Sequence, residues 1–213
     1  MEETHRRTDV LKSSPPMFET RWLDKLSRVH PAVPVVIFVP AIGILMSFAF
    51  ARLSALTAVA LIAGGYLFWS LTEYWIHRAI FHFEPEDGLG ARFHWIIHGV
   101  HHDHPNDPLR LVMPPSVSVP LSSLFCLLFW AVLGTPNWYA FATGFLAGYL
   151  IYDMTHYYLH HHKPRTHVGR WLRELHMRHH FQDDTTGFGI SAPYWDRVFG
   201  TYSKRRSRKA AAE

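Results

Sequence analysis

The stretch EYWIHRAIFHFEPEDGLGARFHWIIHGVHHD, from Glu73 to Asp103, contains six of the seventeen histidines in the chain. Long apolar runs lead into it and out of it, and similar histidine patterns return twice further along the chain. In total ten histidines fall into four spaced groups: His77 and His82; His98, His101 and His102; His156 and His160; and His176, His179 and His180. The rest of the chain is best understood from these groups.

The spacing within the groups indicates helices that carry metal ligands. Residues three and four apart lie on one face of an α-helix, so each H-x-x-H-H and the H-x-x-x-H can direct imidazoles at a single point. His77 and His82 are five apart, which on a regular helix turns the second roughly 140° away from the first. We therefore expect a π-bulge or a helix end between these two residues.

Ten imidazoles exceed one coordination sphere. A structural zinc site closes with four ligands that usually include cysteine, whereas the one cysteine of this chain, Cys126, lies in an apolar run away from every histidine group. Two metal ions that share nitrogen ligands are the simplest interpretation. Imidazole suits zinc, copper, iron and nickel, so ligand type alone does not identify the metal.

The distribution of apolar residues predicts an all-α integral membrane protein. Hydrophobic residues make up 48% of the 213 residues, yet the mean hydropathy of −0.03 is that of an ordinary soluble protein. The apolar residues are, however, concentrated in long uncharged runs at 33–51, 53–71, 117–133 and 138–152. We expect four transmembrane helices in two hairpins, with the fourth helix continuing through His160.

Basic residues predict the orientation in the membrane. Lysine and arginine gather before residue 31, in the 72–113 connection and after residue 162, whereas the two tight turns carry only Arg52. Four crossings place the three basic regions and all the histidine groups on the cytoplasmic side, as a helical cap that holds a dimetal centre. Both termini are then cytoplasmic, and the membrane is a bacterial plasma membrane or the endoplasmic reticulum.

The flanking segments complete the predicted domain organisation. Residues 1–30 are a polar segment followed by an amphipathic helix at 17–29, which either lies on the membrane surface or packs on the domain as a cap helix. Residues 31–202 form the membrane domain. Residues 203–213 are a basic tail, which suits anionic lipid headgroups better than nucleic acid in a membrane protein.

Four further side chains are candidates for supporting roles. Glu73 and Asp153 each lie about one helical turn before a histidine, so they are candidates for orienting a ligand or for neutralising nearby charge, and Asp153 also for holding a lipid headgroup. Tyr149 and Tyr152 are either substrate contacts or aromatic residues of the membrane interface.

The sequence motifs also resemble a known family. The segments EYWIHRAIFH, HGVHH, RLVMPP, YDMTHYYLHH, LHMRHH and FGISAPYWDRVFGTY are similar to those of the membrane fatty acid hydroxylases, a superfamily that includes sterol desaturases and carotenoid hydroxylases. RLVMPP and the YD before H-x-x-x-H point most sharply to the fatty acid 2-hydroxylases, also called ceramide α-hydroxylases. The resemblance extends from about Trp22 to Tyr202.

The resemblance implies the chemistry of the site. It implies a non-haem di-iron centre held by the ten grouped histidines, with zinc as a substitute in purified or crystallised protein, and O₂ as co-substrate. It also implies a membrane lipid substrate, hydroxylated at carbon 2 of an acyl chain. Many eukaryotic members carry a cytochrome b5-like domain with an HPGG motif, which this sequence lacks. We therefore expect a separate electron donor, either cytochrome b5-like or a ferredoxin with its reductase.

Two alternatives stay open at this point. The first is a sterol or carotenoid hydroxylase or desaturase of the same superfamily. The second is a histidine-rich protein that binds or transports divalent metals. Storage tracts lack helical register, however, and a transporter needs polar ligands at mid-membrane depth, which the four apolar runs do not offer.

Overall fold

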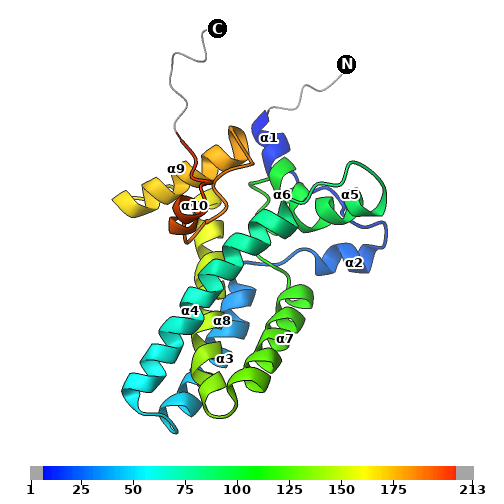
Figure 1. Ribbon diagram of the computed structural model, residues 1–213. Coiled ribbons are helices and arrows are strands. Elements are labelled where there is room, and N and C mark those ends of the chain that lie inside the picture. Colours follow the sequence, from blue (N-terminus) through cyan, green and yellow to red (C-terminus); the bar gives the residue numbers. More distant parts are fainter. Residues whose placement is uncertain (1–6, 205–213) are drawn as a thin grey trace, which may run out of the picture.

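The computed structural model describes residues 7–204, which form helices, turns and loops without a β-strand (Figure 1). The predicted basic tail beyond residue 204 and residues 1–6 lie outside the described residues. In chain order the helices are α1 (Arg7–Lys12), α2 (Arg21–Leu26), α3 (Ala32–Phe50), α4 (Ala55–Ile76), the π-helix η1 (His77–Phe81), α5 (Gly88–His94), the π-helix η2 (Trp95–Gly99), α6 (Val100–Asp103), α7 (Pro115–Leu133), α8 (Asn137–His161), α9 (His167–Phe181) and α10 (Tyr194–Val198). The all-α prediction is confirmed.

The four long helices form a bundle, and the shorter helices gather at one end of it (Figure 1). The α3–α4 hairpin closes in a tight turn at Arg52, and the side chain of Ser54 caps α4 by accepting a hydrogen bond from the Thr57 backbone N–H at 3.2 Å. In the α7–α8 hairpin, Gly134 ends α7 with a φ of 65°, a conformation that glycine adopts without strain. Both predicted hairpins are therefore present, and α8 extends to His161 as expected.

Three helices among residues 7–204 are long and apolar enough to cross a membrane: Ala32–Phe50, Ala55–Phe81 and Pro115–Leu133. The protein is therefore a membrane protein with at least these candidate spans. At 25 residues α8 is also long enough, but it is less apolar and lies against α3, α4 and α7 in the centre of the bundle. The count of four spans stays a prediction.

Glycines allow α4 and α8 to approach each other at backbone distance. A Cβ atom at Gly65 would lie 2.0 Å from the Phe141 carbonyl oxygen, and one at Gly144 would lie 1.9 Å from the Ile62 carbonyl oxygen. Small residues at such crossings are typical of membrane helices, where close packing holds helices together. The crossing matters for the site because α4 leads into the first histidine pair and α8 carries the third group.

The predicted amphipathic helix at 17–29 is wrong in its length. Helix α2 covers only Arg21–Leu26. Residues before it are held in a loop, because the Met17 backbone N–H donates to Asp24 Oδ1 at 2.8 Å and two prolines precede it. Trp22 of α2 is 62% exposed, so an apolar side chain faces outward as an interfacial helix requires.

Candidate metal centre

A π-helix brings the first two histidines together, which is one of the two outcomes, a π-bulge or a helix end, that the five-residue spacing predicted. At the end of α4 the backbone widens into η1, and the His82 N–H donates to the His77 carbonyl oxygen at 3.1 Å. One π turn places residues five apart on the same face. The His77 and His82 rings consequently lie 5.0 Å apart between centroids.

A second π-helix, η2, precedes the first H-x-x-H-H motif and was not predicted. It holds His98 and passes into α6, which carries His101 and His102. A regular helical spacing gives no signal for such a widening.

The ten grouped histidines all converge on one region and divide into two sets of five. Within each set the candidate ligand atoms lie within 4.8 Å of one another. We call them set A and set B. Set A contains His77, His82, His98, His102 and His179, and set B contains His101, His156, His160, His176 and His180.

The H-x-x-H-H motifs therefore do not aim at single points, and that expectation is wrong. In each motif the first and last histidines, four residues apart, join one set, while the middle histidine joins the other. The reason is geometric, since consecutive residues on an α-helix point about 100° apart. The H-x-x-x-H pair of α8 does share one set, as predicted.

Within each set, Nε2 atoms of different histidines lie close together, and hydrogen bonds between them cannot satisfy all of these nitrogens. In set A, His98 Nε2 lies 3.1 Å from His77 Nε2 and 3.0 Å from His102 Nε2. In set B, His101 Nε2 lies 3.0 Å from the Nε2 atoms of both His156 and His180. A neutral imidazole nitrogen offers either one proton or one lone pair. Several converging lone pairs fit a cation at their centre.

Two further nitrogens support this fit. His82 Nε2 and His179 Nε2 are buried and have no hydrogen-bond partner. His179 Nδ1 lies 2.7 Å from the Thr186 carbonyl oxygen, and His77 Nδ1 lies 2.7 Å from that of Phe188. A carbonyl only accepts, so Nδ1 carries the proton and Nε2 presents its lone pair to the centre. The residues present therefore suit a metal ion in each set.

The two backbone carbonyls come from a loop that sequence reasoning did not assign to the site. This loop returns from α9 over the end of α4, and Asp196 of α10 holds it. Asp196 accepts hydrogen bonds from the backbone N–H groups of Phe188 and Gly189, both at 2.9 Å, and from the Thr201 hydroxyl at 2.8 Å. The loop belongs to the segment FGISAPYWDRVFGTY, which resembles the family, and an aspartate among apolar and aromatic residues was the available signal.

Replacing Asp196 with asparagine is expected to weaken metal binding. Asparagine keeps the size but offers one acceptor oxygen instead of two, so the loop loses part of its support and His77 and His179 lose their fixed orientation. Removing such an outer partner typically costs about 10- to 100-fold in metal affinity. Competition with a chelator, followed by metal analysis, measures the change. Asp184→Asn, an exposed change in the same loop, serves as control, and equal affinity in both variants would contradict the assignment.

The four proposed supporting residues lie beside the histidines without a direct hydrogen bond to them. Glu73 accepts from the Ser191 backbone N–H at 2.7 Å and from the Ser191 hydroxyl, which ties α4 to the carbonyl-bearing loop. Asp153 accepts from the Met113 N–H at 3.2 Å and from the Tyr149 hydroxyl at 3.3 Å. Tyr152 packs against the His156 ring. Their roles in substrate binding or ligand orientation stay predictions.

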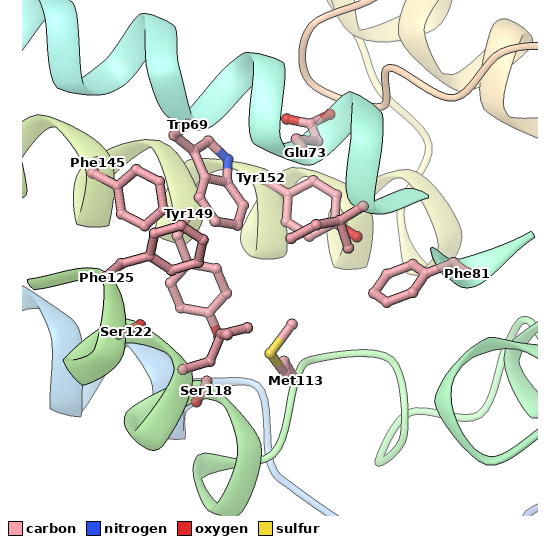
Figure 2. A pocket seen from close by; sticks show the side chains of 12 residues that line it. Trp69, Glu73, Phe81, Met113, Ser118, Ser122, Phe125, Phe145, Tyr149 and Tyr152 are labelled. Carbon is pink, nitrogen blue, oxygen red and sulfur yellow. The ribbon is translucent and has the colours of Figure 1, made fainter. Parts of the chain in front are cut away.

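An apolar cavity of about 290 Å³ reaches histidines of both sets. His98 of set A and His101 of set B line it, together with Tyr152 and Asp153. A smaller pocket of about 20 Å³ lies deeper, between α4, α7 and α8, and Figure 2 shows its aromatic wall around Trp69 and Tyr149. The two cavities share Phe81, Met113 and Tyr152 in their walls.

Burial keeps the ligand imidazoles neutral. Removal from water and then the neighbouring His179 lower the pKa of His82 to about 2, and the same causes lower the pKa of His102 to about 3. The pKa of His180 is also far below its usual value, through burial and then His176. Neutral imidazoles are the form that binds metals.

The metal-free protein is expected to melt at a lower temperature at pH 5 than at pH 7.5. Unfolded histidines take up protons below their ordinary pKa of 6.5, while His82 and His102 in the folded protein stay neutral until about 2 and 3. The unfolded state then binds more protons, so stability is present above pH 6.5 and is lost as the pH falls. Thermal unfolding in one detergent at both pH values tests this, and an equal or higher melting temperature at pH 5 would count against it.

Comparison with known proteins identifies the family. The model of the fatty acid hydroxylase family matches residues 62–201. This chain belongs to that family. It is 38% identical over 198 residues to the dihydroceramide fatty acyl 2-hydroxylase FAH2 of Arabidopsis thaliana, which covers 90% of this chain and 81% of the relative. The resemblance found in the motifs is thus confirmed.

Two further relatives agree with this assignment. This chain is 37% identical over 207 residues to the ceramide very long chain fatty acid hydroxylase SCS7 of Saccharomyces cerevisiae. The match includes 95% of this chain but only 53% of the relative. A solved structure of full-length scs7p, in which only the hydroxylase domain is visible, superposes with a TM-score of 0.80 at 36% identity. It covers 88% of this chain and 72% of that one. The protein is therefore a hydroxylating oxidoreductase of the membrane.

Proposed function

We propose that this hydroxylase inserts one oxygen atom at carbon 2 of a fatty acyl chain, most favourably the N-acyl chain of a ceramide or related sphingolipid. The observation that carries the proposal is the apolar cavity whose wall contains histidines of both sets. A hydrocarbon in that cavity lies beside the proposed metal ligands. Relatives named as dihydroceramide fatty acyl 2-hydroxylase and ceramide hydroxylase support the choice of lipid.

The ten histidines of sets A and B are proposed to hold two iron ions, five nitrogens for each. When bound, the iron pair would supply O₂ activation and oxidation of an unactivated C–H bond, chemistry that amino-acid side chains lack. The chain supplies position and electrostatics. Carbonyl partners fix the tautomers of His77 and His179, and burial keeps the ligands neutral.

Asp153 and Tyr152 are proposed to position the lipid. Both line the cavity next to His156, and the Asp153 carboxylate can accept a hydrogen bond from the amide N–H of an N-acyl lipid. Carbon 2 is the first chain atom beyond the amide carbonyl, so holding the amide there keeps carbon 2 close to the histidines. The carbons next to the amide would lie in the 290 Å³ cavity, since the 20 Å³ pocket of Figure 2 has room for little more than a water molecule.

The proposal also includes orientation, domain limits and electron supply. The bundle spans the membrane with four helices, α8 among them. The histidine cap and the described ends of the chain face the cytoplasm, across either a bacterial plasma membrane or the membrane of the endoplasmic reticulum. Residues 31–202 form the hydroxylase domain. Two electrons for each turnover come from a separate cytochrome b5-like protein or from a ferredoxin with its reductase.

Oxygen uptake coupled to a lipid product tests the function. Purified protein loaded with iron is supplied with a reductase system and, in separate reactions, with a ceramide, a free fatty acid, a sterol or a carotenoid. We expect oxygen uptake with the acyl lipid and a product heavier by one oxygen atom. A product lighter by two hydrogen atoms would indicate a desaturase, and metal binding without any oxygen uptake would favour a metal-binding protein.

A further inference from the structure

Residues 10–29, which we call the strap, are joined to the rest of the molecule at one place. In the described part of the chain, apart from the backbone bonds within α1 itself, every hydrogen bond that leaves the strap ends on residues 104–110. The Val29 N–H, for example, donates to the Leu109 carbonyl oxygen at 2.6 Å. Helix α2, within the strap, has no extensive packing against another helix. The polar contacts that hold the strap are therefore confined to this one connection.

The strap also forms one wall of the large cavity. Met17, Phe18, Leu23, Leu26 and Ser27 line it. Pro114, Ser116 and Val117 at the start of α7 line it as well, and Figure 1 shows α2 near that end of α7. Because α7 is apolar enough to cross the membrane, the contact between strap and α7 lies at the bilayer boundary.

Arg110 makes the strongest link between strap and cavity. Its side chain is 3% exposed, lines the cavity, and donates to Asp24 Oδ1 at 2.7 Å and to the Pro15 carbonyl oxygen. Asp24 accepts two further hydrogen bonds, from the Met17 N–H and from Arg28, both inside the strap. The buried ion pair thus joins the folded strap as a unit to the loop that follows His101 and His102.

Among the described residues, the Arg110–Asp24 pair is the one ion pair that joins the strap to the rest of the chain. If this pair is broken, Asp24 keeps its partner Arg28 inside the strap and Arg110 keeps Asp107 in its own loop. The strap then loses its charged link to the loop, while each charge still has a partner. The outer side of α2 is only loosely covered, since Trp22 is 62% exposed. With the basic residues Arg21 and Lys25 close to it in sequence, the Trp22 side chain suits the lipid surface.

We propose that the strap is the gate through which the lipid enters the cavity, that the Arg110–Asp24 pair is its latch, and that Phe18, Leu23 and Leu26 select the hydrocarbon that fits beneath it. The inference rests on the proposed function, since it assigns the cavity to an acyl lipid. Arg110 is in this view a positioning residue. It acts on the substrate through the strap and takes no part in the oxidation.

Hydrogen exchange and kinetics on the full chain in lipid nanodiscs test the gate. Arg110→Met and Asp24→Asn break the latch, and Arg110→Lys keeps a cation. We expect amides of residues 17–29 to exchange about tenfold faster in the first two variants, with exchange in α4 and α8 unchanged. We also expect the KM for a ceramide to change by about fivefold or more while kcat stays within about twofold. Arg110→Lys should recover part of both effects.

Arg28→Met is the matched control, because Arg28 also bonds Asp24 but all its hydrogen bonds stay within the strap. It should change exchange and KM far less. Unchanged amide exchange of the strap in Arg110→Met would overturn the gate. Loss of bound metal together with faster exchange throughout the bundle would also overturn it, because Arg110 would then have a structural role in the whole fold. If Arg110→Met shows faster strap exchange but the parent protein hydroxylates no acyl lipid, the proposed function is overturned and the role of the Arg110–Asp24 pair in holding the strap remains.

Discussion

Replacing His101 with alanine is expected to remove about one metal ion per chain and to abolish measurable lipid hydroxylation. His101 Nε2 faces two other Nε2 atoms of set B at 3.0 Å, and the same ring lines the cavity. A bound metal is worth several kcal/mol of transition-state stabilisation, so its loss lowers the rate by about a thousandfold or more. Metal analysis of the purified protein and product formation per folded chain measure the two effects.

His94→Ala is the matched control for this change. His94 lies in the same stretch of sequence and contacts Glu84 at 3.8 Å, but it belongs to neither set of five. This variant should keep both metal ions and an activity within a few-fold of the parent. Full metal content and full activity in His101→Ala would contradict the assignment of His101 to the centre.

Gly65→Ala is expected to prevent stable folding, although it adds only one methyl group. The new Cβ atom would lie 2.0 Å from the Phe141 carbonyl oxygen, and a backbone atom cannot turn away as a side chain can. Overpacked cores typically lose about 1–3 kcal/mol and occasionally more, and this contact belongs to the severe end because two helix backbones must separate. Thermal unfolding and the fraction of monodisperse protein in detergent measure the loss.

Gly64→Ala provides a control one residue away. A Cβ atom there would meet the Phe141 ring at 3.5 Å, an ordinary contact. This variant should fold like the parent. A Gly65→Ala protein that melts at the same temperature as Gly64→Ala would show that α4 and α8 do not cross at these glycines.

The bundle was predictable because its signals are local. Uncharged runs, the turn residues around Arg52 and Gly134, and the histidine spacing each depend on neighbours in sequence, and they predicted both hairpins and helices at the histidine groups. The short extent of α2 was missed, because it depends on a side chain, Asp24, that binds the backbone of Met17. The burial of α8 in the bundle also needs the tertiary arrangement.

The gathering of the histidines was predictable, and its arrangement was not. Spacing selected the ten histidines that the structure brings together, and the five-residue gap between His77 and His82 predicted a π-bulge or a helix end, of which the structure has the first. The division into two sets was not predictable, because it depends on how four separate helical segments meet. The carbonyl groups of Thr186 and Phe188 were also missed, because every residue has a backbone carbonyl and the sequence does not show which of them face a histidine.

The central claim is oxygen insertion at carbon 2 of an acyl lipid, and lipid mass spectrometry tests it most directly. Cells expressing the parent protein and cells expressing His101→Ala at equal level are grown under isotopically heavy oxygen gas, and their lipids are fragmented. The account predicts an acyl lipid that gains one heavy oxygen atom at carbon 2 with the parent only. Heavy oxygen at another carbon, or no changed lipid although both metals and a reductant are present, would contradict it.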